Sequence, residues 1–229
     1  MPEDVIRKRK IKMDKAKLIE KIEKEKLIVI VRGVGKDKLL PLADALYRGG
    51  VRLMEITFDK SGRTAPDAVV DNIRMLKEHT DGRMHIGAGT VTTEEEVELV
   101  ANVGGEFIIS PDTYEDVIRR TVELGLVSIP GALTPTEAAT AHRYGADFVK
   151  LFPVSGLGTS YIKAIKAPLS HIRFLAVGGV DLGNIDEYMK TGIAGVGIGS
   201  NIIDKELISR GEFDKIEDLA RRYVEAVGG

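Results

Sequence analysis

The chain of 229 residues contains no cysteine, only four histidines and no long apolar run. The absence of cysteine excludes disulfide bonds and thiolate metal sites, which fits a reducing cytoplasm. Removal of cysteine by engineering is an alternative explanation. No apolar run approaches the about 18 residues of a membrane-spanning helix, and the N-terminus has no signal-peptide pattern. We therefore expect a cytoplasmic protein without a membrane partner.

Histidine and net charge narrow the class of protein further. The four histidines are scattered, and no H-x-H or histidine–carboxylate cluster stands at the end of a predicted strand. We therefore expect no metal and no other cofactor. The net charge of −2 offers no overall basic surface for a nucleic-acid partner. Hydrophobic residues make up 43% of the chain and charged residues 30%, which indicates a globular protein.

The first 26 residues differ from the rest of the chain. They contain ten lysines and arginines against six acids, and Leu18, Ile19 and Ile22 form an apolar stripe at helical spacing. We predict a helical extension over residues 1–26 that packs on the following domain with its basic face in solvent. A nucleic-acid or membrane role for residues 7–12 is the alternative, although no aromatic residue is interleaved with the basic ones.

From residue 27 onwards, short apolar runs alternate with amphipathic segments. We predict strands at 27–31, 52–57, 84–88, 107–109, 127–129, 148–151, 173–176 and 195–198. We predict helices at 36–48, 65–79, 93–103, 113–124, 135–143, 159–166, 182–190 and 213–227.

The spacing of these elements predicts the fold class. From the third strand on, consecutive strand ends are 20–26 residues apart. Such βα repeats require parallel strands joined by right-handed crossovers. Eight of them predict one α/β domain, a (β/α)8 TIM barrel over residues 27–229. An open doubly wound sheet is the alternative, but no G-x-G-x-x-G follows the first strand.

One lysine lies inside an apolar strand. Lys150 stands between Val149 and Leu151, and Pro153 ends the strand because it has no N–H to donate. Burial lowers the pKa of a lysine, and a neutral amine attacks carbonyl carbons. The pattern therefore indicates a Schiff-base lysine. A lysine whose amine reaches solvent from a strand end is the alternative.

An acid occupies a similar position in the second predicted strand. Period-two alternation puts Leu53, Glu55 and Thr57 on one face of this strand. If that face points into the barrel, Glu55 meets Lys150 and can act as a general acid and base with a raised pKa. The alternative is a structural partner for a buried cation.

Glycine-containing loops follow the last two predicted strands. Gly178-Gly179 and Gly199-Ser200 stand where (β/α)8 barrels commonly bind phosphate, because glycine lets backbone N–H groups approach an anion. Ser200 could in addition cap the next helix. Simple tight turns are the alternative. Further candidate substrate-binding residues stand at other strand ends: Arg32, Thr57, Thr90, Pro111 and Phe152.

Together these motifs resemble the bifunctional 2-keto-3-deoxy-6-phosphogluconate (KDPG) and 4-hydroxy-2-oxoglutarate (KHG) aldolases, class I pyruvate aldolases with a barrel fold. The resemblance spans about residues 27–201. It rests on Glu55-Ile56-Thr57, Gly87-Ala88-Gly89-Thr90-Val91, Ile109-Ser110-Pro111, Pro130-Gly131-Ala132-Leu133-Thr134-Pro135-Thr136-Glu137, Lys150-Leu151-Phe152-Pro153, Val177-Gly178-Gly179-Val180 and Gly197-Ile198-Gly199-Ser200.

The resemblance implies a role for each motif. It implies Lys150 as the Schiff-base residue and Glu55 as the proton shuttle, with Thr90 and Pro111 around the pyruvyl group and the glycine pairs near the phosphate. The implied substrates are 2-keto acids: KDPG, cleaved to pyruvate and glyceraldehyde 3-phosphate, and KHG, cleaved to pyruvate and glyoxylate. The resemblance also implies a cytosolic homotrimer.

Two features depart from the family pattern. Many members carry an arginine four residues after the catalytic glutamate, where this chain has Asp59. We expect Asp59 to turn towards Lys60 or Arg63, and Arg32 to hold the substrate carboxylate instead. Binding the phosphate is the alternative role for Arg32. Family members usually begin close to Met13, so residues 1–12 look like an extension.

Two other functions fit the sequence. One alternative is an engineered, trimeric building block of a larger designed assembly. The missing cysteines, the basic first helix and the terminal Gly228-Gly229 suggest this alternative. The other alternative is a phosphate-binding barrel without catalytic activity.

Overall fold

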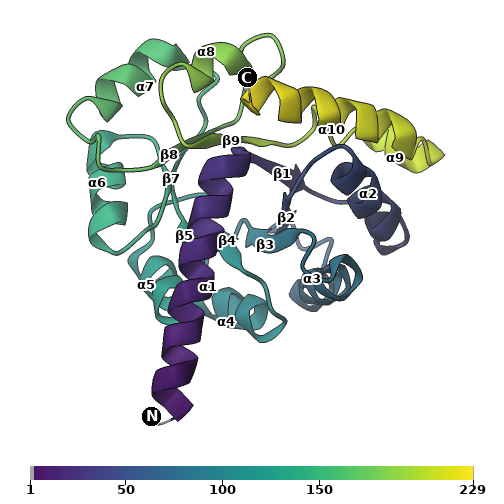
Figure 1. The fold of residues 1–229 in the computed structure, drawn as a ribbon, viewed down its shortest axis with the longest axis horizontal. Coiled ribbons are helices and arrows are strands. Elements are labelled where there is room, and N and C mark those ends of the chain that lie inside the picture. The colour runs from purple at the N-terminus through teal and green to yellow at the C-terminus, as the bar shows by residue number, and fades with distance from the viewer. Residues whose placement is uncertain (1–2, 229) are drawn as a thin grey trace.

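The computed structural model describes the backbone of residues 3–228 and the side chains of residues 14–228. Parallel strands form a barrel with helices around it (Figure 1). The strands are β1 (Leu27–Val31), β2 (Leu53–Thr57), β3 (His85–Gly89), β4 (Phe107–Ile109), β5 (Val127–Ile129), β6 (Gly131–Ala132), β7 (Val149–Leu151), β8 (Phe174–Val177) and β9 (Gly195–Ile198). The helices are α1 (Glu3–Glu25), α2 (Lys36–Arg48), α3 (Pro66–Thr80), α4 (Glu94–Asn102), α5 (Glu115–Glu123), α6 (Pro135–Arg143), α7 (Gly158–Lys166), α8 (Ile185–Met189), α9 (Lys205–Arg210) and α10 (Phe213–Gly228).

Pro130 divides the fifth strand of the barrel into β5 and β6. The sheet order is β5-β4-β3-β2-β1-β9-β8-β7-β6, so β5 pairs with β4 and β6 with β7. Proline cannot donate to a ladder, but its carbonyl can accept. The N–H of Lys150 donates to the Pro130 carbonyl at 2.8 Å, and the N–H of Phe148 donates to the Ser128 carbonyl at 3.2 Å. These bonds join the two ends of the sheet, and the predicted (β/α)8 barrel is confirmed.

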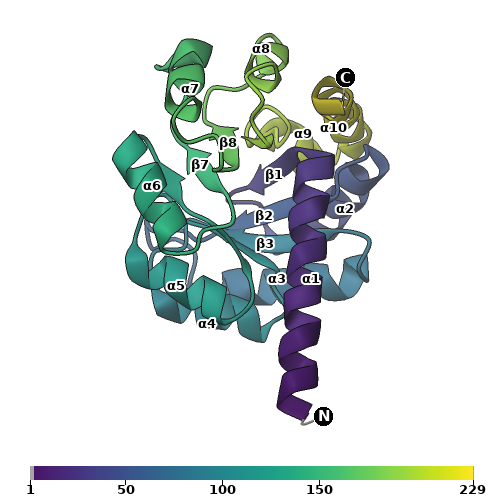
Figure 2. The same ribbon diagram turned by 60° about the vertical axis from the view of Figure 1, so that its left-hand side comes forward.

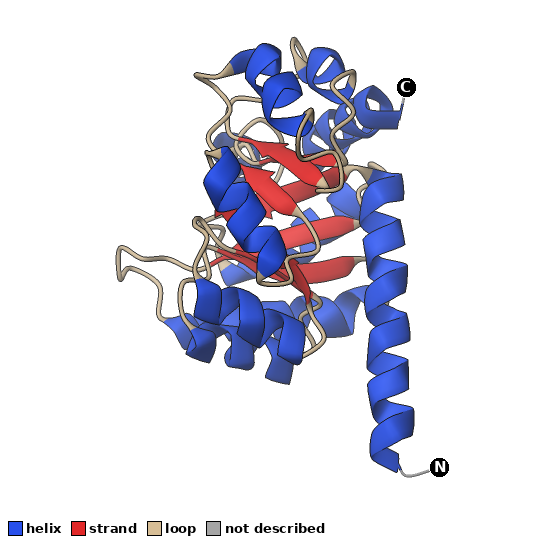
Figure 3. Cartoon of the chain, turned by 90° about the vertical axis from the view of Figure 1, so that its left-hand side faces the viewer, coloured by secondary structure: helices blue, strands red, loops and turns tan. Residues whose placement is uncertain are grey.

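Helix α1 covers the amino ends of the strands (Figure 3). Its side chains Leu18 and Ile22 are 5% and 0% exposed and pack against the apolar interior of the barrel. Burying an aliphatic side chain of this size stabilises the fold by about 1.5–3 kcal/mol. Lys15 also forms an ion pair with Asp147 at 2.9 Å. The first turns of α1 extend beyond the barrel (Figure 2), and the basic side chains of residues 7–12 lie outside the described ones.

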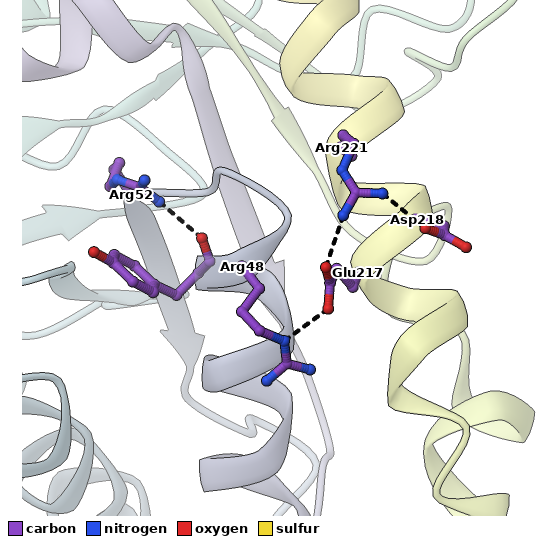
Figure 4. A network of polar contacts seen from close by, with 6 residues as sticks. Arg48, Arg52, Glu217, Asp218 and Arg221 are labelled. Carbon is purple, nitrogen blue, oxygen red and sulfur yellow. Dashed lines mark hydrogen bonds and ion pairs between the residues drawn. The ribbon is translucent and has the colours of Figure 1, made fainter.

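Helices α2 and α10 lie side by side and are joined by charged side chains (Figure 4). Glu217 of α10 accepts hydrogen bonds from Arg48 of α2 and from Arg221, both at 2.7 Å. Beneath them the backbones approach closely, since a Cβ added to Gly49 would lie 2.6 Å from the Cβ of Ala220. These contacts hold α10 against α2 on the outside of the barrel.

The segment after β9 differs from the prediction. The short helix α9 was not expected, because six residues are too few to show a helical period. Its N-cap is Asp204, which accepts from the N–H groups of Glu206 and Leu207 at 2.8 and 3.0 Å. The expectation that Ser200 caps the next helix is therefore wrong, because the chain first turns at Gly199, whose carbonyl accepts two backbone N–H groups. No helix within residues 3–228 is long and apolar enough to cross a membrane.

Candidate active site

Glu55 lies inside the barrel near its carboxyl-end mouth. It is 3% exposed, and Leu53 on the same face of β2 belongs to the apolar cluster of the barrel interior. Burial raises the pKa of Glu55 to about 7, and the positive charges of Lys150 and Arg32 oppose this shift. Its Oε2 atom has no hydrogen-bond partner among the described residues. Glu55 therefore offers a buried carboxylate oxygen that is free to exchange a proton near neutral pH.

Two glycines of β3 make the room for this acid. A Cβ added to Gly89 would lie 1.4 Å from Oε1 of Glu55, and one added to Gly87 would lie 2.3 Å from the Phe107 ring. Gly87 and Gly89 are two residues apart in β3 and therefore lie on the same face of the strand, which is the face towards the barrel interior. Only glycine at these two positions leaves space for Glu55 and Phe107.

Lys150 is the second buried charged group of the barrel. Its side chain is on β7, and the residue is 8% exposed. Burial lowers its pKa; the charges of Glu55 and Asp112 act against this, and that of Arg32 acts with it. The Nζ atom lies 5.0 Å from the centre of the Phe152 ring. So little exposure argues against an amine that reaches bulk solvent, and the lowered pKa favours the neutral, nucleophilic form.

The turn after β4 closes one side of the pocket around Lys150. A Cβ added to Gly131 would lie 2.2 Å from the carbonyl oxygen of Pro111. The N–H of Gly131 donates to the Asp112 carbonyl at 3.2 Å, and the Ser110 hydroxyl donates to the same carbonyl at 3.0 Å. These contacts hold Pro111 and Asp112 next to the start of β6, which pairs with the strand of Lys150.

Arg32, Thr57 and Thr90 come together at the ends of three neighbouring strands. Arg32 Nη2 donates to the Thr90 hydroxyl at 3.2 Å, and Thr90 has a positive φ of 58°. The Thr57 hydroxyl donates to the Val31 carbonyl at 3.4 Å. Because β1, β2 and β3 are parallel neighbours, their ends bring a guanidinium and two hydroxyls beside Glu55.

Asp59, which stands where many of the similar aldolases carry an arginine, is bonded within its own turn. Its carboxylate accepts from the N–H and the hydroxyl of Ser61 and from the N–H of Thr64, at 2.9, 2.5 and 3.1 Å. Arg63 lies 3.9 Å away, whereas Lys60 pairs with Glu96 instead. Asp59 was expected to turn towards Lys60 or Arg63, and it turns towards Arg63.

The predicted phosphate loops lie at the ends of neighbouring strands, β8 and β9. Gly178 and Gly179 have φ values of 83° and 96°. A Cβ at Gly179 would lie 2.4 Å from the Cβ of Ser155, so part of the reason for glycine is close packing of two loops. The backbone N–H groups of Gly178, Gly179, Gly199 and Ser200 donate to no other residue within the described range.

The prediction that no histidine–carboxylate cluster stands at a strand end needs one correction. His85 opens β3 and lies 2.9 Å from Glu106, which also accepts from Lys77 at 2.6 Å. A histidine–carboxylate pair therefore does stand at a strand end, but at the amino end, opposite the pocket. Among residues 14–228, no group of three histidine, aspartate or glutamate side chains is arranged to hold a metal ion.

Comparison with known proteins decides the family. The sequence pattern of the KDPG and KHG aldolases matches residues 18–219. The chain belongs to this aldolase family. It is therefore a class I aldolase, a lyase that works through a Schiff base with its substrate.

Individual relatives agree with this assignment. The 2-dehydro-3-deoxy-6-phosphogalactonate aldolase of Escherichia coli (strain K12) is 39% identical over 178 residues, which cover 77% of this chain and 83% of the relative. A KDPG aldolase structure from Legionella pneumophila, with pyruvate captured as a covalent carbinolamine, is 27% identical, with a TM-score of 0.79 over 87% of this chain and 94% of that one. A chain of a designed cube-shaped, highly porous protein cage is 35% identical, with a TM-score of 0.79 over 89% of this chain and 72% of that one.

Proposed function

We propose that this aldolase cleaves a 6-phosphorylated 2-keto-3-deoxy sugar acid, the shorter KHG, or both, with Lys150 as the Schiff-base residue and Glu55 as the general acid and base. The observation that carries this proposal is the pair of opposite pKa shifts inside the barrel. Burial lowers the pKa of Lys150 and raises that of Glu55 to about 7. The lowered pKa of Lys150 favours its nucleophilic form, and Glu55 can accept and return a proton near neutral pH.

The reaction follows from these two side chains. The amine of Lys150 attacks C2 of the 2-keto acid, and loss of water gives an iminium. The iminium withdraws electrons, so the C3–C4 bond breaks as the C4 hydroxyl gives its proton to Glu55, directly or through one water. The aldehyde leaves, Glu55 returns a proton to C3 of the enamine, and hydrolysis releases pyruvate and the free amine.

Arg32 is the proposed partner of the substrate carboxylate. Its hydrogen bond to Thr90 directs the guanidinium towards the end of β3, close enough to Glu55 and Lys150 for its charge to shift the pKa of both. A carboxylate in a largely apolar pocket needs such a charge-assisted partner. Thr90 and Pro111 are the proposed walls around the pyruvyl group, and Thr57 is a further candidate for substrate binding.

The glycine loops are the proposed phosphate site. It is supported by four backbone N–H groups at the ends of neighbouring strands, on Gly178, Gly179, Gly199 and Ser200, which have no acceptor among the described residues, because oriented backbone donors bind anions. The ring of Phe152 lies near Lys150 and against Gly178, between the proposed Schiff-base residue and the proposed phosphate site. The pyruvyl group and the phosphate would therefore lie on opposite sides of Phe152.

The substrate is tested by measuring pyruvate release from three compounds: the phosphogluconate-derived keto acid, its phosphogalactonate epimer and KHG. The galactonate relative supports the second of these, and the family description supports the first and third. We expect pyruvate from at least one of them. Pyruvate from none would contradict the proposal and favour a phosphate-binding barrel without activity.

The assembly is a second proposal: a cytoplasmic homotrimer of the 24.9 kDa chain. The designed cage with a chain of similar fold supports the alternative of a building block. The solution mass separates the two. Three times the chain mass supports the plain trimer, and a closed particle several times heavier supports the building block.

A further inference from the structure

A cavity opens at the carboxyl ends of β1, β2 and β3, and its lining includes Arg32, Thr57 and Thr90 of the candidate active site. It has a volume of about 520 Å³ and lies between the β1–α2 and β2–α3 connections. Leu39, Ile56 and Val69 are among its apolar lining residues. Within the described part of the chain, neither Lys150 nor Glu55 lines this cleft. A cavity of this size suits a small ligand.

Four cationic side chains line the cleft, and two of them are neutralised by acids. Lys60 pairs with Glu96, whose other oxygen accepts from the N–H of Thr92. Arg63 lies 3.9 Å from Asp59, whose oxygens are also bonded within their own turn. The acids near the cleft are thus engaged with their own neighbours.

The other two cations, Arg32 and Lys205, form no ion pair within residues 14–228, although the charge of Arg32 acts on the buried Glu55. Arg32 donates only to the neutral hydroxyl of Thr90. The Nζ atom of Lys205 lies against the next residue of the same connection, 3.8 Å from where a Cβ of Gly33 would be. Two like charges that face one cavity repel each other, and a bound anion would remove this repulsion.

We propose that this cleft is a second anion-binding site, which holds a small phosphate-type dianion between Arg32 and Lys205. It is distinct from the phosphate site proposed at Gly178-Gly179 and Gly199-Ser200. The inference rests on the proposed function in one respect, the assignment of the substrate carboxylate to Arg32. Because both anions then use Arg32, phosphate in the cleft competes with the 2-keto acid and inhibits the enzyme.

Binding is tested without any chemistry by calorimetric titration of the full chain with inorganic phosphate. Two classes of site are expected in the wild-type protein. Lys205→Ala should weaken one class about ten- to a hundredfold, as loss of a hydrogen bond to a charged group does, whereas Lys205→Arg should largely keep it. Lys17→Ala removes the same charge at the opposite end of the barrel and should leave both classes unchanged. Unaltered phosphate binding by Lys205→Ala would overturn the proposal.

Competition is tested by trapping pyruvate with borohydride at constant ionic strength, with and without inorganic phosphate. In the wild-type protein, phosphate should raise the pyruvate concentration needed for half-maximal labelling, and Lys205→Ala should be less sensitive. Labelling that does not change when phosphate is added would contradict the inference and leave the proposed function intact. The same would follow if phosphate affected Lys205→Ala as strongly as the wild-type protein. If no adduct formed even in the absence of phosphate, the proposed function would be contradicted instead. The calorimetric titration would then still test whether the cleft binds phosphate.

Discussion

Gly89 leaves the space that Glu55 occupies: a Cβ added to Gly89 would lie 1.4 Å from Oε1 of Glu55. The two residues belong to neighbouring parallel strands, and Thr57 and Gly89 are partners in the same register. The position of the buried carboxylate therefore depends on a glycine in the adjacent strand as well as on β2 itself.

Replacing Gly89 by alanine should displace Glu55 from its place near Lys150. We expect turnover to fall by about 10²-fold or more, the contribution of a general acid and base, and the overpacking to cost about 1–3 kcal/mol of stability. Steady-state kinetics and thermal unfolding measure the two effects. Gly228→Ala, a site with open space around it, is the control and should alter neither. Normal turnover in Gly89→Ala would show that the placement of Glu55 is unimportant.

Glu55 should set the lower limb of the pH–rate profile. Because the base is the ionised form and the pKa of Glu55 is raised to about 7, kcat/KM should increase with pH and reach half its maximum at about pH 7. Glu55→Gln should lack this limb and lose about 10²–10⁴-fold in turnover.

Trapping of pyruvate separates the roles of Glu55. In Glu55→Gln, Lys150 keeps its amine, so slow formation of the reducible adduct should persist while turnover is lost. Near-normal turnover in this variant would mean that Glu55 only balances the charge of the site.

Arg32→Ala should weaken phosphorylated and unphosphorylated substrates by a similar factor, since both carry the same carboxylate. The loss of a hydrogen bond to a charged group predicts about 1.5–3 kcal/mol, a ten- to a hundredfold rise in KM. Arg143→Ala on α6, where the arginine donates to the Thr140 hydroxyl, is the control. A defect confined to phosphorylated substrates would assign Arg32 to the phosphate.

Ser200→Asp should raise KM for a phosphorylated substrate far more than for KHG. The added carboxylate would stand beside the free N–H groups of the glycine loops and repel the phosphate. Ser209→Asp adds the same charge on the exposed surface of α9 and should affect neither substrate. Equal effects of Ser200→Asp on both substrates would argue against a phosphate site at these loops.

Much of the fold was predictable because each βα unit carries a local signal. Helix α6 has the predicted bounds, 135–143, since its proline and capping residues mark its start. The pairing of β6 with β7 beyond Pro130 was not predictable, because it depends on closure of the ring and not on the local pattern. The local sequence pattern also did not predict α9, because this helix is too short for a periodic signal.

Period-two alternation placed Leu53, Glu55 and Thr57 on one face of β2, and the structure shows that Glu55 on this face is buried inside the barrel. The space left by Gly89 and the contact between Arg32 and Thr90 were not predicted, since both depend on the register of β1, β2 and β3. One signal was available: Gly87 and Gly89 stand two residues apart, which leaves one face of β3 without side chains.

The most direct test of the account is borohydride reduction in the presence of pyruvate, followed by peptide mass mapping. We expect one reduced pyruvyl adduct per chain, on Lys150. Lys166 is the matched control, because burial also lowers its pKa, although it lies on α7 and donates to the Gly192 carbonyl. Lys150→Ala should therefore abolish labelling with the barrel still folded, and Lys166→Ala should label normally. An adduct on another lysine, or none in the wild-type protein, would contradict the assignment of Lys150 as the Schiff-base residue.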